Sequence, residues 1–143
     1  MSTLDALQAA LAGEHACVYG YGLLGAHVTD GDLDDVRAAY EIHRSRRQEL
    51  SHQIRIRYGE PVAALPAYAV PFDVEGPGAA RELAGLLEQR LAVLYADLVA
   101  TTRVPELREY AAGVLVDTAV LATRWTGRTT ALPGLDGVPE PSE

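Results

Sequence analysis

One segment, residues 58–77, divides the chain into two halves and constrains its fold more than any other feature. It contains four prolines, Pro61, Pro66, Pro71 and Pro77, and a continuous helix cannot accommodate them, because the proline ring removes a backbone donor and clashes with the preceding turn. Extended at ~3.3 Å per residue, ~20 residues reach ~66 Å. A helix of ~26 residues is only ~39 Å long. The segment is therefore long enough to run from one end of a helical bundle to the other.

The first half carries two segments with helical signals. Residues 2–28 begin with the capping pattern Ser2-x-x-Asp5 and then repeat apolar residues at steps of three and four. Residues 32–57 can use Asp32 as the N-cap, with acidic residues in the first turn. The pattern predicts two long helices joined by a short polar turn near residues 29–31.

The second half repeats this arrangement. One helix is predicted to begin at Pro77, and another at Pro105, each with proline in its favoured first-turn position, and the last helix should end before Gly127. Because the turns inside each half are short, each half should form an antiparallel hairpin. The sequence therefore predicts an all-α fold: a four-helix bundle of two antiparallel helical hairpins, joined by a long crossover link between helices two and three.

Composition limits the classes of partner. The net charge of −8 argues against nucleic acid, because binding to its backbone depends on clustered cations. No segment approaches the ~18 uninterrupted apolar residues that span a bilayer, and no basic region precedes the first apolar residues. We therefore expect no nucleic-acid or membrane partner and a cytoplasmic location. The single cysteine, Cys17, is interpreted as a small core residue.

Ionisable residues interrupt the apolar stripe near the midpoint of each predicted helix. In chain order they are Glu14, His43, Glu88 and Asp117. Because antiparallel packing brings helix midpoints to one height, these groups should converge inside the bundle. The stripes assigned to the second and fourth helices are Val36, Tyr40, His43, Arg47, Leu50 and Ile54, and Leu107, Tyr110, Val114, Asp117, Leu121 and Arg124.

The two halves also match at one fixed offset of 74 residues. At this offset Glu14 matches Glu88, and Tyr21 matches Tyr95. His43 falls on Asp117. A repeat at the core carboxylate and its tyrosine is what a bundle with two-fold symmetry would use, so the repeat supports the predicted fold.

Four stretches carry a resemblance to a known family: AALAGEHACVYGYGLLGAHV, AAYEIHRSRR, PAYAVPF and ADLVATTRVPELREYAAGVLVDTAVLATRW. They resemble the ferritin-like superfamily, and most of all a small actinobacterial ferritin-like domain family of unknown function. The resemblance covers residues 4 to about 135, which we take as one domain, 1–135, followed by a disordered tail, 136–143. It implies a four-helix bundle with a long crossover between helices two and three.

Metal-binding members of this superfamily supply a glutamate from helices one and three and Glu-x-x-His from helices two and four. Glu14 and Glu88 match the lone glutamates, and His43 matches the histidine of helix two. Tyr40 stands where the glutamate of that helix would be. The ligand pattern is thus incomplete in helix two.

Helix four departs further from the pattern. Asp117 could stand for its glutamate, but Val120 occupies the position of its histidine and cannot coordinate a metal. Arg47, one turn beyond His43, would supply the positive charge that a metal otherwise brings. The departures favour a salt-bridged core over a working metal centre.

The sequence therefore favours a non-catalytic protein, with no catalytic residue and no cofactor, that binds a partner protein or forms a homodimer. In this interpretation the four ionisable residues form a charged core with Arg47, Tyr21, Tyr40 and Tyr95. The alternative is a metal site for iron or manganese, with oxidoreductase or metal-storage activity, whose ligands are Glu14, His43, Glu88 and Asp117.

Overall fold

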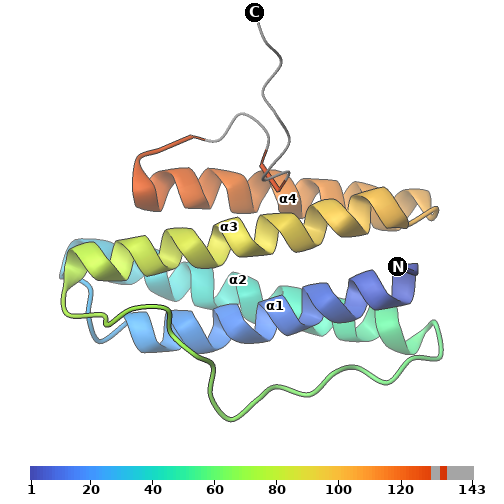
Figure 1. The fold of residues 1–143 in the computed structure, drawn as a ribbon, viewed down its shortest axis with the longest axis horizontal. Coiled ribbons are helices and arrows are strands. Elements are labelled where there is room, and N and C mark those ends of the chain that lie inside the picture. Colours follow the sequence, from blue (N-terminus) through green and yellow to red (C-terminus); the bar gives the residue numbers. More distant parts are fainter. Residues whose placement is uncertain (130–132, 135–143) are drawn as a thin grey trace, which may run out of the picture.

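The computed structural model describes residues 1–129 and 133–134, and it contains four α-helices (Figure 1). They are α1 (Thr3–Leu24), α2 (Asp30–Arg55), α3 (Pro77–Thr101) and α4 (Pro105–Thr126). No strand occurs in the described residues. The prediction of an all-α four-helix bundle is confirmed, whereas the tail expected at residues 136–143 lies outside the described part of the chain.

Local sequence sets most of the helix ends. Ser2 begins α1 with a full capping box: its hydroxyl accepts a hydrogen bond from the backbone N–H of Asp5, and the carboxylate of Asp5 accepts one from the backbone N–H of Ser2. Proline occupies the first turn of α3 and of α4. Gly127 ends α4 with a φ of 71°, a left-handed conformation that glycine adopts readily.

Three helix boundaries differ from the sequence prediction, one of them the end of α2, which lies at Arg55 rather than near residue 57. α1 ends at Leu24 rather than near Val28, and α2 begins at Asp30, with Thr29 as the N-cap residue, rather than at Asp32. Val28 packs against the core from the turn. Its apolar character therefore reflects burial and does not extend the helix.

Neighbouring helices pack against each other along three of the four sides of the bundle. α1 packs against both α2 and α3, and α3 packs against α4. Two glycines of α1 allow α3 to approach closely, because a Cβ atom at Gly13 or Gly20 would lie 2.5 Å from a methyl group of Leu94 or Leu87. The fourth side is open: no Cα atom of α2 lies within 8 Å of one in α4, and both helices are described in full.

α2 and α3 run in the same direction. Nη1 of Arg81, near the start of α3, lies 3.1 Å from Oδ2 of Asp32, near the start of α2. Both helices therefore begin at one end of the bundle, and residues 56–76 return along its length (Figure 1).

The link between α2 and α3 is attached to α1 by side-chain hydrogen bonds. Gln8 donates to the carbonyl of Glu60 (2.6 Å) and accepts from the backbone N–H of Val62 (2.9 Å). Farther along α1, Nε2 of His15 lies 2.9 Å from the carbonyl oxygen of Val62. These bonds hold the link against the bundle.

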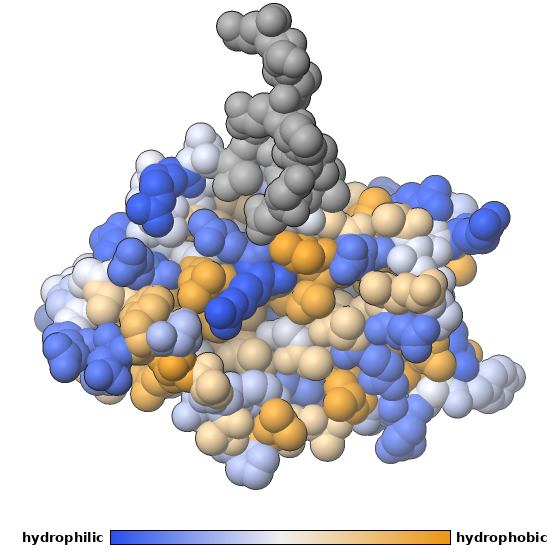
Figure 2. Space-filling view, viewed as in Figure 1, coloured by the Kyte–Doolittle hydropathy of each residue, from blue (hydrophilic) through white to orange (hydrophobic). Residues whose placement is uncertain are grey.

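The core is apolar except near its centre. Leu7, Leu11, Leu24, Leu50, Ile54, Leu91 and Leu98 are among its fully buried side chains. Cys17 is a free, buried cysteine, 2% exposed, as the sequence predicted. On the face drawn in Figure 2, hydrophobic residues occur in small groups separated by hydrophilic ones. Among the described residues, no helix combines the length and the apolar character needed to cross a membrane.

Candidate functional site

Three ionisable side chains meet at the centre of the apolar core. Glu14 of α1, His43 of α2 and Glu88 of α3 are each 0% exposed. Burial of charged groups is costly unless they are paired and hydrogen-bonded. The structure thus brings together three of the four ionisable residues that the sequence placed at the helix midpoints.

The imidazole of His43 lies between the two carboxylates. Its Nδ1 lies 2.6 Å from Oε2 of Glu14, and its Nε2 lies 2.9 Å from Oε1 of Glu88. A neutral imidazole carries one N–H and could donate to only one of them. Burial would lower the pKa of His43, but the hydrogen bonds and charges of Glu14 and Glu88 raise it to about 9. The geometry therefore favours a doubly protonated ring.

Each glutamate also accepts a hydrogen bond from a tyrosine of the facing helix. Tyr21 of α1 donates to Glu88 (2.6 Å), and Tyr95 of α3 donates to Glu14 (2.7 Å). Burial, together with the neighbouring carboxylate, raises the pKa of both phenols well above the usual value. Both tyrosines therefore remain protonated donors, in the crosswise pattern that the 74-residue repeat produces.

α4 contributes two side chains that sequence analysis did not single out. Thr118 donates to Oε2 of Glu88, and Nε1 of Trp125 donates to the hydroxyl of Tyr21 (3.0 Å). Burial would raise the pKa of Glu88, but its bonds to His43, Thr118 and Tyr21 lower it. The sequence signal that could have identified Thr118 is its spacing of four residues from Val114, which places both side chains on one face of the helix.

Asp117 does not join the cluster, and the prediction that it faces the core is wrong. Its side chain is 69% exposed, and Oδ2 lies 3.6 Å from Nη2 of Arg46. The buried face of α4 continues from Val114 to Thr118, a step of four residues. The predicted stripe instead took a step of three residues, from Val114 to Asp117. The small side chain at position 118 occupies the space between α3 and α4.

Arg47 is also placed wrongly by the sequence pattern. Arg46 is the buried arginine of α2, at 8% exposed, whereas Arg47 is only partly buried. Tyr40 is partly buried as well, and the guanidinium of Arg44 lies 5.8 Å from the centre of its ring. The positive charge that faces the two buried glutamates belongs to His43.

Cys17 lies beside the cluster and completes a group of three candidate metal ligands. One ligand atom each from Glu14, Cys17 and His43 lies within 4.8 Å of the other two. Burial, with the charges of Glu14 and Glu88, raises the pKa of the Cys17 thiol well above its usual value. A metal needs the thiolate, so binding here would have to displace both a thiol proton and a histidine proton.

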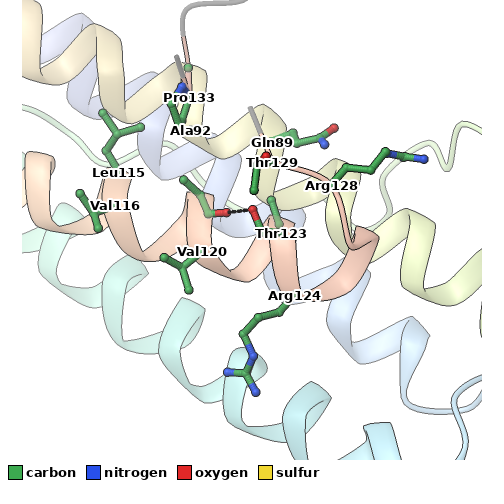
Figure 3. Close-up of a pocket in the computed structure, with 13 residues that line it drawn as sticks. Gln89, Ala92, Leu115, Val116, Val120, Thr123, Arg124, Arg128, Thr129 and Pro133 are labelled. Atoms are coloured by element: carbon green, nitrogen blue, oxygen red, sulfur yellow. Dashed lines mark hydrogen bonds between the residues drawn. The ribbon is translucent and has the colours of Figure 1, made fainter. Parts of the chain in front are cut away.

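A second candidate site, a pocket of about 650 Å³, lies on the outer side of α3 and α4 (Figure 3). Leu115, Val116 and Val120 line it with apolar side chains. The hydroxyl of Thr123 donates a 3.1 Å hydrogen bond to the carbonyl of Ala119 in its own helix. The titratable residues among its described lining are two arginines, Arg124 and Arg128. This pocket lacks the mutually bonded polar groups of the buried cluster, which is the better candidate site.

Comparison with known proteins gives a family and a structural relative. A family model described as "Domain of unknown function (DUF4439)" matches residues 6–137. No curated protein matches the chain. The solved structure titled "Crystal structure of a conserved hypothetical protein, rv2844, from Mycobacterium tuberculosis" is 32% identical, with a TM-score of 0.85, and the match covers 87% of this chain and 95% of that one.

Proposed function

This chain belongs to the family described as "Domain of unknown function (DUF4439)", and we propose that it is a non-catalytic, ferritin-like bundle in which a protonated histidine replaces a metal ion. The observation that supports this is the position of His43, whose two ring nitrogens lie 2.6 Å and 2.9 Å from carboxylate oxygens of Glu14 and Glu88. These three residues occupy the helices that supply metal ligands in ferritin-like metal proteins.

The charges of the cluster are consistent with this replacement. Two carboxylates and one imidazolium leave one net negative charge in the core. The hydroxyls of Tyr21, Tyr95 and Thr118 donate to the carboxylate oxygens and disperse that charge without adding a cation. The cluster therefore satisfies its carboxylates from the protein's own side chains.

The residues present do not fit a two-metal centre. Such a centre takes Glu-x-x-His from two of its helices. In α2 the residue three before His43 is Tyr40, and α4 turns Thr118 toward the cluster while Asp117 faces outward. Val120 is 54% exposed. The site therefore lacks the ligands that oxygen activation at two metals would need.

We propose that the bundle acts by association, with a partner protein or with a second copy of itself. Exposed apolar residues on α2 and α4 support this: Ile42, Val116 and Val120 are 41%, 61% and 54% exposed. Apolar side chains left in water on helix surfaces are candidates for burial in a complex. Sedimentation equilibrium over a range of concentrations tests the homodimer. If the protein were a monomer at every concentration, self-association would be excluded. Binding to a partner protein would then be the remaining form of the proposed association.

Two measurements test the proposed core. Nitrogen-15 NMR of the histidine rings should show both nitrogens of His43 protonated at neutral pH. Plasma mass spectrometry, on protein purified without an affinity metal column and again after loading with ferrous iron, should find no stoichiometric metal. A neutral His43 ring together with one or more equivalents of bound metal would contradict the proposal.

A second candidate function is metal binding, with iron or manganese and an oxidoreductase or storage role. The proximity of Glu14, Cys17 and His43 favours it. In this case bound metal should be lost in His43→Ala and reduced in Cys17→Ser, while His52→Ala, on the exposed side of α2, should keep it. Metal content that is unchanged by all three variants would place any bound metal elsewhere.

A further inference from the structure

The open side of the bundle, between α2 and α4, holds a groove of about 780 Å³. The groove lies beside the buried cluster, because its residue Tyr110 is close to Tyr95 and Glu14. Its walls are one helical stripe from each helix, with Arg46 and Glu49 on α2 and Tyr110 and Asp117 on α4. It has the volume of a small-molecule site. The chemistry of its walls defines what it could hold.

Arg46 is a buried donor that the protein does not fully use. The residue is 8% exposed and lines the groove. Its Nη2 lies 3.6 Å from Oδ2 of Asp117, but its Nη1 is buried and has no hydrogen-bond partner among the described residues. Leaving a buried N–H of a charged group unbonded is costly. The missing partner is an acceptor, and the guanidinium favours a carboxylate.

The hydroxyl of Tyr110 adds a second donor in the same groove. It too is buried, and it makes no hydrogen bond of normal geometry among the described residues, although it lies close to the hydroxyl of Tyr95. Burial and the nearby charge of Glu14 raise the pKa of Tyr110 to about 12, so the hydroxyl keeps its proton at neutral pH. A guanidinium and a phenol that share a groove suit the two oxygens of one carboxylate.

The rest of the groove excludes a simple anion. Besides Arg46, its formally charged lining residues are four carboxylates, Glu49, Glu106, Glu109 and Asp117, which leaves a formal charge of −3. A ligand that suits both parts must bring a carboxylate together with a larger positive charge. A free amino acid with a cationic side chain meets this condition, because it carries one carboxylate and two positive groups.

We propose that the groove between α2 and α4 binds a free basic amino acid, whose carboxylate lies against Arg46 and Tyr110 and whose two cationic groups face the acidic walls. This binding role goes beyond the association proposed above and does not depend on it. Glu14, His43 and Glu88 do not line the groove.

Isothermal titration calorimetry on the full chain tests this with three matched probes. They are L-lysine, cadaverine, which is lysine without its carboxylate, and L-norleucine, which lacks the side-chain ammonium. Lysine should bind with a Kd about tenfold or more below that of either analogue. Equal binding of lysine and cadaverine, equal binding of lysine and norleucine, or no binding of lysine at millimolar concentration would each overturn the proposal.

Variants connect the binding to the named side chains. Arg46→Met should weaken lysine binding about tenfold or more, and Tyr110→Phe and Glu109→Gln should each weaken it several-fold. Arg44→Met is the matched control, because Arg44 is exposed on the same helix and pairs with Glu41. If circular dichroism shows that Arg46→Met does not fold, lysine binding by Tyr110→Phe and Glu109→Gln tests the proposal instead. Lysine binding that is unchanged in those two variants would overturn the proposal.

Discussion

The hydroxyl of Tyr21 donates a 2.6 Å hydrogen bond to Glu88 and accepts a 3.0 Å bond from the indole nitrogen of Trp125. One side chain of α1 thereby joins α3 to α4. The matching bond at the other end of the cluster runs from Tyr95 to Glu14 and joins α3 to α1. The two ends of the cluster are therefore related by sequence repeat but differ in the number of helices that they connect.

This difference predicts unequal losses on removing the two hydroxyls. Tyr21→Phe should lower the free energy of unfolding by about 2–3 kcal/mol, because both Glu88 and Trp125 lose a partner, and Tyr95→Phe by about 1–2 kcal/mol. Urea denaturation measures both. Tyr58→Phe, at a fully exposed position, is the control and should leave the value unchanged. A larger loss in Tyr95→Phe than in Tyr21→Phe would contradict the assigned network.

Removal of the bridging histidine should cost more than removal of either hydroxyl. In His43→Ala, the carboxylates of Glu14 and Glu88 remain buried without their cation, so we expect a loss of about 3–5 kcal/mol in the free energy of unfolding. His52→Ala, at an exposed position of α2, should have a small effect. Equal midpoints for the two variants in urea would mean that His43 does not hold the carboxylates together.

Stability should also fall as the pH rises from 6.5 to about 9. Burial opposes the charge on His43, but the bonds to Glu14 and Glu88 raise its pKa from 6.5 to about 9. Between these values the folded protein holds a proton that the unfolded chain has released, so the free energy of unfolding decreases with pH. A pKa difference of this size corresponds to about 3 kcal/mol.

The stabilisation from His43 is complete below 6.5 and lost as the pH passes about 9. The phenols of Tyr21 and Tyr95 do not interfere, because their raised pKa values lie above 10. Urea denaturation at a series of pH values, for the wild type and His43→Gln, checks this. A slope between 6.5 and 9 that persists in the variant would assign the dependence to other groups.

Two acidic residues of facing helices give a direct test of which one belongs to the core. Asp117→Asn should change the free energy of unfolding by less than about 1 kcal/mol, because its side chain is 69% exposed and its ion pair with Arg46 is long. Glu88→Gln should cost about 3 kcal/mol or more, since it removes a buried charge that faces His43. If thermal or urea unfolding showed a larger loss of stability in Asp117→Asn than in Glu88→Gln, the assignment of Asp117 to the surface would be wrong.

The sequence by itself determined the four helices and the height at which Glu14, His43 and Glu88 meet. The capping box at Ser2, the first-turn prolines and the stop at Gly127 act through backbone groups within a few residues, so they can be read without knowledge of the neighbours. The midpoint positions of Glu14 and Glu88 follow from the same segment lengths. Local chemistry is sufficient for these features.

Only the tertiary structure decided which of two adjacent residues faces inward. A helix turns about 100° per residue, and its period of about 3.6 lies between steps of three and four, so a stripe that passes through Val114 can continue to either Asp117 or Thr118. Packing against α3 selected Thr118, and packing of α2 selected Arg46 over Arg47. The bridge from His43 to both glutamates likewise required three helices in place at once, because each of its hydrogen bonds joins residues at least 29 positions apart.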